Sequence, residues 1–157
     1  MEKLDKADKE ILQLLQENCR LSAREIAKKT GSLTTTVYAK IRRMEQLGVI
    51  KGYHAEIEGK TVDRGVKAIV LVSFDYHSGK GKALSQRDIA KQVASFAEVQ
   101  DVHIISGDWD LSLKVVAENV DKIGQFVIDK LRKIDGIDKV TSNLVFGTEK
   151  ESLQINI

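Results

Sequence analysis

Residues 21–53 read LSAREIAKKTGSLTTTVYAKIRRMEQLGVIKGY and contain the strongest structural signal in the chain. Ser22 stands before the first apolar-periodic run and Glu25 follows three residues later, the spacing of a capping box at a helix N-terminus. Gly31 predicts the end of that helix, because glycine readily adopts the left-handed conformation that closes many helices. A second helix should follow at once, with hydroxyl caps offered by Thr34, Thr35 and Thr36.

The second helix is predicted to bury one side and expose the other. Val37, Ile41 and Met44 recur at the i, i+4, i+7 spacing of a single apolar stripe. Gly48 should end the helix, and the alternating run over residues 49–57 suits the strand of a wing. The segment therefore predicts a helix pair with a tight turn, followed by a wing.

The exposed side of the second helix combines hydrogen-bonding groups with cations. Hydroxyl and guanidinium groups can reach base edges in a groove of DNA, while cations contact phosphates. We expect Thr35, Tyr38 and Arg42 to approach bases, and the cations, Arg42 included, to neutralise phosphates. The complete set of predicted DNA-binding residues is Thr34, Thr35, Tyr38, Lys40, Arg42, Arg43 and Lys51.

Positive charge is concentrated in the same segment, although the whole chain carries a formal charge of only +2. Between residues 20 and 51 only Glu25 and Glu45 are acidic, and the cations are Arg20, Arg24, Lys28, Lys29, Lys40, Arg42, Arg43 and Lys51. Most charged runs are simply solvated helix faces. Here the cations coincide with a capped helix pair, which favours a nucleic-acid site.

These motifs resemble those of a known family. The resemblance depends on Leu4-Asp5-Lys6-Ala7-Asp8-Lys9-Glu10-Ile11-Leu12, Arg20, Ile26-Ala27, Gly31, Thr36-Val37, Arg42-Arg43 and Gly48-Val49-Ile50-Lys51-Gly52-Tyr53. Together they look like the N-terminal module of the Lrp/AsnC family, the feast/famine transcriptional regulators of bacteria and archaea, and the likeness covers nearly the whole chain. The chain departs from the family pattern at Lys40, where arginine is usual, and at Gly31-Ser32-Leu33, where Gly-Leu-Ser is usual. The resemblance implies sequence-specific DNA binding that regulates transcription.

Length and composition predict two small domains rather than a membrane protein. The 157 residues are 42% hydrophobic and 31% charged, and no apolar run approaches the length that spans a bilayer. The N-terminal residues lack the apolar core of a secretion signal, and Cys19 is the single cysteine, so no internal disulfide can form. We expect a cytoplasmic protein.

Two domains with a short connector are predicted. A helix over residues 5–17 would complete a three-helix module with the pair described above. Residues 58–65 are polar and punctuated by glycine, which suits a linker. The expected division is a winged helix-turn-helix domain over residues 1–60 and a second domain over residues 66–157.

The second domain repeats one plan twice. Two strand-helix-strand units in series predict an α+β fold, a ferredoxin-like βαββαβ (RAM-type) sheet with both helices on one face. The predicted strands are 66–76, 99–106, 109–117 and 139–146, the predicted helices are 86–97 and 120–134, and 77–85 form a polar loop.

A sheet with helices on one side leaves its other face bare. We expect Val70, Val72 and Phe74 on that bare face, where exposure of apolar area to water costs about 25 cal/mol per Å². A second copy of the chain is the natural cover, so we predict a homodimer. A twofold dimer would bind a palindromic operator in double-stranded DNA, and dimers could assemble further into tetramers or octamers.

The turn Ser106-Gly107-Asp108-Trp109-Asp110 is the second motif with chemical content. Glycine would let a ligand carboxylate approach backbone amides, a carboxylate could pair with an ammonium, and tryptophan supplies an apolar wall. An ordinary hairpin turn with a buried tryptophan explains the same residues. The resemblance implies an effector pocket for a small metabolite such as an amino acid, formed by Gly107, Asp108, Trp109, Asp110 and Ser142.

Two other classes of protein remain as alternatives. Sirohaem decarboxylases resemble this family in both domains and act on tetrapyrroles with pocket histidines, for which His103 is the only hint here. A sensor or scaffold whose helical module contacts protein instead of DNA is the other. We expect no enzymatic activity, because the sequence offers neither a catalytic set nor histidines at metal-ligand spacing. No cofactor is expected beyond the amino-acid effector.

Overall fold

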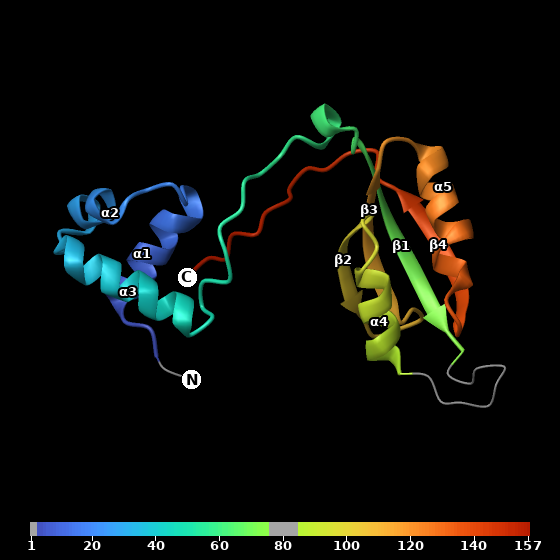
Figure 1. Ribbon diagram of the computed structural model, residues 1–157, viewed down its shortest axis with the longest axis horizontal. Helices are drawn as coiled ribbons and strands as arrows, with labels where there is room; N and C mark the ends of the chain where they lie inside the picture. Colours follow the sequence, from blue (N-terminus) through green and yellow to red (C-terminus); the bar gives the residue numbers. More distant parts are fainter. Residues whose placement is uncertain (1–2, 76–84) are drawn as a thin grey trace. The chain divides into compact units, whose positions relative to one another are not determined.

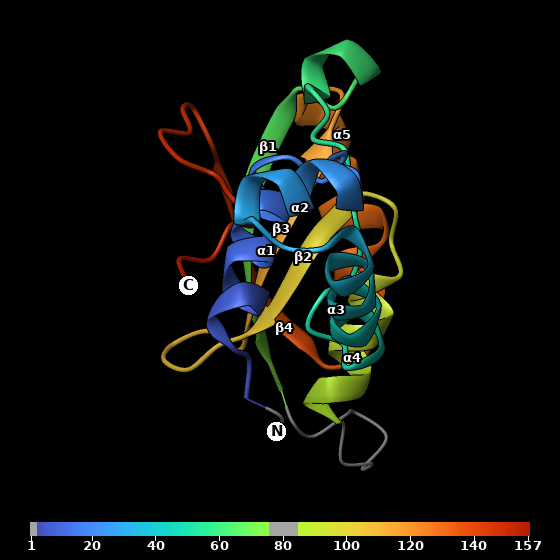
Figure 2. The same ribbon diagram turned by 90° about the vertical axis from the view of Figure 1, so that its left-hand side faces the viewer.

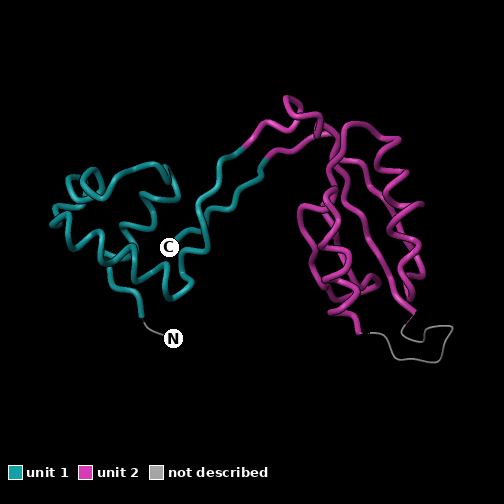
Figure 3. Tube along the Cα trace, in the orientation of Figure 1, with its two compact units in different colours: residues 1–56, 150–157 teal, residues 57–149 magenta. Residues whose placement is uncertain are grey.

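The structure is a computed structural model that describes residues 3–75 and 85–157. The chain divides into two compact units, and Figure 3 colours them separately. Unit 1 comprises Met1–Glu56 together with Lys150–Ile157, and unit 2 comprises Ile57–Glu149. The C-terminal segment therefore belongs with the N-terminal helices, whereas the sequence analysis placed it in the second domain. Two segments of chain connect the units.

Unit 1 contains three helices, which lie next to one another in Figure 2: α1 (Lys6–Glu17), α2 (Ala23–Thr30) and α3 (Thr34–Gln46). The capping box predicted at α2 is confirmed, because the Glu25 amide donates to Ser22 Oγ and the Ser22 amide donates to Glu25 Oε2. Gly31 ends α2 with φ +67°, the left-handed conformation expected there. A second capping box, between Asp5 and Asp8, starts α1.

The start of α3 differs from the prediction. Leu33 is the N-cap, and no side chain caps this helix. The predicted threonine caps are therefore wrong. An N-cap residue has an extended backbone and precedes the helix, whereas Thr34 is already the first helical residue.

The predicted wing strand over residues 49–57 is also absent, because the structure assigns no strand to these residues. A strand needs a partner that accepts its backbone hydrogen bonds. The amides of Val49 and Ile50 instead donate to the carbonyl of Met44, which closes the end of α3. The rest of this run is exposed.

Buried apolar side chains from all three helices form the core of unit 1. Val37 and Met44 are fully buried and Ile41 packs against them, so the apolar stripe of α3 is confirmed. The remaining buried members are Ile11, Leu15, Ile26 and Ala27. The C-terminal segment joins unit 1 at Gln16, whose side chain donates to the Ile155 carbonyl (3.0 Å) and accepts from the Ile155 amide (2.6 Å).

Unit 2 is a four-stranded antiparallel sheet with two helices (Figure 1). The strand order is β2-β3-β1-β4, which is the ferredoxin-like arrangement predicted from the repeated plan. The strands are β1 (Val66–Phe74), β2 (Val99–Ile104), β3 (Leu111–Ala117) and β4 (Ile137–Leu144). The helices are α4 (Gln86–Ala94) and α5 (Val120–Asp129), with 3₁₀ turns η1 (Gly59–Val62) and η2 (Leu131–Lys133).

Both helices of unit 2 are shorter than predicted. The amide of Ser95 donates to the Gln92 carbonyl, a tight turn that ends α4 before Phe96. The predicted helix over 120–134 is α5 followed by η2. Most of the predicted loop over 77–85 lies outside the described residues, as does the end of the strand predicted over 66–76. None of the helices in the described ranges has both the length and the apolar character that a bilayer span requires.

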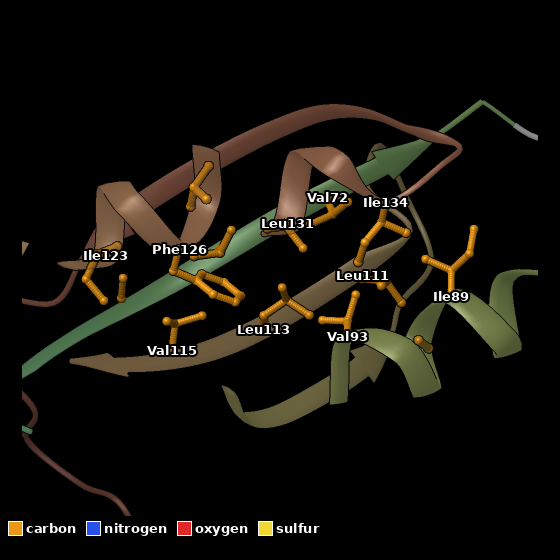
Figure 4. Packing of buried hydrophobic residues seen from close by; sticks show 14 of the residues in the cluster. Val72, Ile89, Val93, Leu111, Leu113, Val115, Ile123, Phe126, Leu131 and Ile134 are labelled. Carbon is orange, nitrogen blue, oxygen red and sulfur yellow. The ribbon is translucent and has the colours of Figure 1, made fainter. Parts of the chain in front are cut away.

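The core of unit 2 lies between one face of the sheet and both helices (Figure 4). Val70 and Val72 of β1 are fully buried there, and Phe74 is nearly so. The prediction that these residues lie on the bare face is therefore wrong. Apolar residues stand on both faces at the centre of β1, so the sequence does not show which face the helices cover.

The opposite face of the sheet is mixed in character. In β1 it carries Ile69 and Leu71, which alternate with the core residues and are only partly buried. The register places Lys114 and Asn143 beside Ile69 and places Ser112 and Thr141 beside Leu71. A short apolar centre flanked by polar side chains thus remains on this face within the described part of unit 2.

Candidate functional sites

Helix α3 presents three stripes of side chains, each with helical spacing. The first stripe is the buried one, Val37, Ile41 and Met44. The second comprises Thr36, Lys40 and Arg43, and the third comprises Thr35, Tyr38 and Arg42. The predicted DNA-binding residues of α3 therefore fall into two groups with different surroundings.

Lys40 and Arg43, in the second stripe, contact carboxylates of α1. The Lys40 ammonium lies 2.6 Å from Asp5 Oδ2 and 2.9 Å from Asp8 Oδ1. The Arg43 guanidinium lies 2.6 Å from Asp8 Oδ2. The charged ends that were predicted to neutralise phosphates are thus paired with carboxylates of the same unit.

The third stripe is open to solvent. Tyr38 is 57% exposed, and the Arg42 guanidinium lies over its ring, 5.8 Å from the centroid. This cation-π contact holds an arginine on the exposed side without using its hydrogen-bond donors. Thr34, Thr35 and Lys51 are exposed as well. These five residues keep their polar groups available to a ligand from solvent.

A hollow of about 440 Å³ lies along α3 between the second and third stripes. It is lined by Thr35, Thr36, Ala39, Lys40 and Arg43. Its cations are the two that already contact Asp5 and Asp8, so the hollow is less positive than its residue types indicate.

Tyr53, which the sequence analysis did not single out as a site residue, ties the segment after α3 to that helix. Its hydroxyl donates to Glu45 Oε1 at 2.9 Å. Burial and this hydrogen bond to a carboxylate raise the pKa of Tyr53 to about 12. Lys51 is therefore carried on a segment anchored at both Met44 and Glu45.

The predicted effector turn is well ordered by hydrogen bonds. The Ile105 amide donates to the Asp110 carbonyl, and the Asp110 amide donates to the Val72 carbonyl, each at 2.9 Å. Gly107 has φ +115°, a conformation that side-chain-bearing residues rarely adopt. The Asp110 carboxylate accepts from the Phe74 amide at 2.8 Å and from Gln86 Nε2 at 3.3 Å. Asp110 therefore has a structural role in joining β1, the turn and α4.

Of the five predicted effector residues, only Trp109 lines the hollow found in this part of unit 2. The hollow has a volume of about 410 Å³, and its other lining residues are Arg132, Ile137, Asp138, Lys139, Val140 and Thr141. Gly107 and Asp108 are exposed beside it on the turn. Ser142 is exposed on β4 and is paired with Val70, which places it on the helix-covered face. No sequence motif indicated the charged residues of the hollow, because Trp109 and Arg132 are far apart in the sequence and line one hollow only in the folded unit.

No group of three or more His, Cys, Asp or Glu residues in the described ranges could hold a metal ion. His54 and His103 are both exposed. Cys19 is a free, exposed thiol at the end of α1.

The chain matches two family models. Residues 67–155 match the Lrp/AsnC ligand binding domain, and residues 4–51 match a winged helix-turn-helix DNA-binding domain. An uncharacterised HTH-type transcriptional regulator of Pyrococcus horikoshii is 38% identical, over 96% of this chain and 97% of that protein. The leucine-responsive regulatory protein of Rhizobium meliloti is 29% identical, over 98% of this chain and 96% of its own length.

Solved structures agree with these matches. A transcriptional regulator from Neisseria meningitidis, solved as a complex with L-methionine, superposes with a TM-score of 0.88 at 26% identity, over 98% of this chain and 97% of that one. An AsnC family regulator from Agrobacterium tumefaciens gives 0.86 at 28% identity, over the same shares of the two chains. The match of both domains over nearly the full length shows that this chain is a member of the Lrp/AsnC family of DNA-binding transcriptional regulators.

Proposed function

We propose that this regulator binds a palindromic operator as a homodimer, with the third stripe of α3 facing the bases, and that a free amino acid bound to unit 2 controls it. The observation that supports the DNA-binding half most directly is the exposed set Thr35, Tyr38 and Arg42 on α3. These groups are a hydroxyl, a phenol and a guanidinium, which suit direct readout in a major groove. Thr34 adds a further hydroxyl at the helix N-terminus.

Lys51 is the proposed phosphate contact outside α3. It is exposed and lies on the segment that Tyr53 anchors to Glu45. A phosphate contact positions a protein on a duplex without reading its sequence. Lys40 and Arg43 are left out of this set, because Asp5 and Asp8 already contact their charged ends.

The proposed homodimer uses the helix-free face of the sheet. Ile69 and Leu71 form its apolar centre, in place of the three core residues that the sequence analysis assigned to it. A twofold pair of chains would present two copies of α3 to two half-sites, which explains a palindromic operator. Light scattering during size exclusion should give twice the chain mass, and assemblies of dimers would give four or eight times that mass.

The proposed effector is an amino acid at the hollow beside Trp109. Arg132 and Asp138 line this hollow with charges of opposite sign, which suit the carboxylate and ammonium of a free amino acid. The exposed turn with Gly107 and Asp108 borders it. The methionine complex of the similar Neisseria regulator supports the same ligand class. A panel of amino acids should raise the thermal midpoint of unit 2, and no response from any of them would remove this part of the proposal.

The DNA-binding half is tested by selecting bound fragments from genomic DNA and then measuring affinity at several salt concentrations. We expect a symmetric consensus. Arg42→Ala should weaken binding by about 1–3 kcal/mol and relax the preference at one base position, because the lost contact reads a base. Lys51→Ala should weaken binding to all sequences alike.

Three outcomes of this experiment contradict the proposal. Two variants that both bind like the parent protein would show that α3 does not face DNA. Association that ignores salt would indicate a protein partner instead, because phosphate contacts release counterions. A tetrapyrrole absorbance band that follows the purified chain would indicate enzyme-like chemistry.

A further inference from the structure

Asp8 is the one buried charged residue in the described part of the chain, and it sits at the N-terminus of α1 with 0% exposure. Both of its oxygens are used. Oδ1 accepts from the Lys40 ammonium at 2.9 Å, and Oδ2 accepts from the Arg43 guanidinium at 2.6 Å and from the Asp5 amide at 2.9 Å. The carboxylate therefore joins α1 to two residues of α3 that are 32 and 35 positions away in sequence.

A carboxylate in this position needs its partners. Burial alone would favour the neutral acid, because a charge loses its hydration on leaving water. Burial does act to raise the pKa of Asp8, but hydrogen bonds from the Asp5 amide and from Lys40 outweigh it and lower the pKa. Asp8 is therefore an anion at neutral pH, and it holds the two cations that stabilise it.

The same contacts neutralise the second stripe of α3. Asp5 adds a second carboxylate, 2.6 Å from the Lys40 ammonium, so two anions face the two cations of the stripe. The Lys40 side chain is 20% exposed and that of Arg43 is 36% exposed, so neither is free to extend fully into solvent. Arg42, one residue from Arg43, points to the other side of the helix, over Tyr38.

We propose that Asp8 is a positioning residue for DNA binding, which withholds Lys40 and Arg43 from phosphates and fixes α3 so that Arg42 alone of its cations contacts the duplex. This inference rests on the proposed role of α3 in DNA binding. It adds that a buried carboxylate on α1 controls how many cations the exposed side of α3 presents to DNA.

The salt dependence of DNA binding tests this proposal directly. Each phosphate contact lowers log K by about 0.9 for each tenfold rise in salt, so the slope reports how many cations contact phosphates. The probe is a random-sequence duplex of fixed length. Far-UV circular dichroism of each variant verifies that its helices are intact before the measurement.

Asp8→Asn keeps the size of the side chain and removes its charge. Lys40 and Arg43 then lose the anion that they share, although Asp5 still contacts Lys40. Each cation that turns to a phosphate should make the slope steeper by about 0.9. Adding Lys40→Met to Asp8→Asn should bring part of that increase back. A purely structural role for Asp8 predicts weaker binding with an unchanged slope, and that result would overturn the proposal.

Single substitutions of the other cations give the matched comparison, and they decide the question even if Asp8→Asn fails to fold. Lys40→Met and Arg43→Met should leave the slope of the parent protein unchanged, while Lys51→Met, which removes the proposed phosphate contact, makes it shallower by about 0.9. A slope that falls as much for Lys40→Met as for Lys51→Met overturns the inference but leaves the proposed function intact. A slope that none of these variants changes, Lys51→Met included, would instead overturn the proposed function.

Discussion

Units 1 and 2 differ in the size of their apolar cores and in whether a charged residue is buried beside the core. Among the described residues, the core of unit 2 contains sixteen buried apolar residues and no buried charge, whereas that of unit 1 contains six, beside the buried Asp8. A small unit buries a smaller fraction of its surface on folding, so its apolar stabilisation is limited. Unit 1 adds two capping boxes and an ion network to a small core.

The two units should therefore respond to different solution conditions. Apolar packing is insensitive to salt and pH, whereas ion pairs and caps respond to both. The DNA-binding unit is therefore the one whose stability and surface charge depend on ionic conditions. The ligand-binding unit depends mainly on apolar packing, which suits a frame that supports a pocket.

The largest effect that distinguishes the two units is expected from Phe126→Ala. Phe126 is almost fully buried, and its ring packs edge-on against Phe96 with centroids 5.7 Å apart. The substitution should cost about 3–5 kcal/mol through lost burial and a cavity. Trp109, the only tryptophan, reports unit 2 by fluorescence, and its urea midpoint should fall.

The helices of unit 1 serve as the internal control for this substitution. The circular dichroism signal that remains after unit 2 has unfolded comes from unit 1. Its urea midpoint should equal that of the parent protein. A shift of both transitions by the same amount would show that the units unfold together, and the contrast between them would then be wrong.

Acid should affect unit 1 before unit 2. The pKa of Asp8 is below its ordinary value of 3.8, so its contribution to stability is present above pH 3.8 and is lost as pH falls through the lower folded value. The pKa of Asp5 is lowered as well, first by its hydrogen bond with Lys40. In unit 2 the pKa of Glu98 is lowered by Lys130 against the effect of burial, but that side chain is still 24% exposed.

An acid titration followed by two probes tests this order. Helix content by far-UV circular dichroism should begin to fall at a higher pH than the Trp109 fluorescence changes. Asp8→Asn should remove much of the separation between the two transitions. Coincident transitions in the parent protein would mean that the ion network contributes no distinct stability to unit 1.

The smallest effect is expected at the helix caps. Ser22→Ala removes a hydroxyl that accepts from the Glu25 amide and should cost about 1 kcal/mol of the stability of unit 1. Thr34→Ala is the matched control, because Thr34 makes no capping bond, and it should change stability by less than about 0.5 kcal/mol. Equal losses from the two variants, measured by urea unfolding, would show that the threonine does cap α3.

Features that depend on neighbouring residues were predictable from the sequence. The Ser22–Glu25 capping box, the left-handed Gly31 and the apolar stripe of α3 each follow from spacings of three to seven residues. The order of strands and helices in unit 2 also follows, because each copy of the repeat contains its own local signals. The outer stripe with Tyr38 and Arg42 was found in the same way.

Features that depend on distant pairs were not predictable in this way. Lys40 and Arg43 have the charge and helical position of DNA contacts, and only the approach of α1 shows that Asp8 binds them. Likewise Gln16 and Ile155 are 139 residues apart, and their hydrogen bonds assign the C-terminal segment to unit 1.

Residue spacing and composition were enough to predict the two-part architecture and the exposed side of α3, since periodicity and caps are local properties of a chain, and the family followed from the resemblance of those motifs. The partner of each cation on that helix, the covered face of β1 and the lining of the hollow at Trp109 required the folded molecule. The physical reason is that desolvation and charge pairing depend on distances through space, which a linear order of residues does not contain.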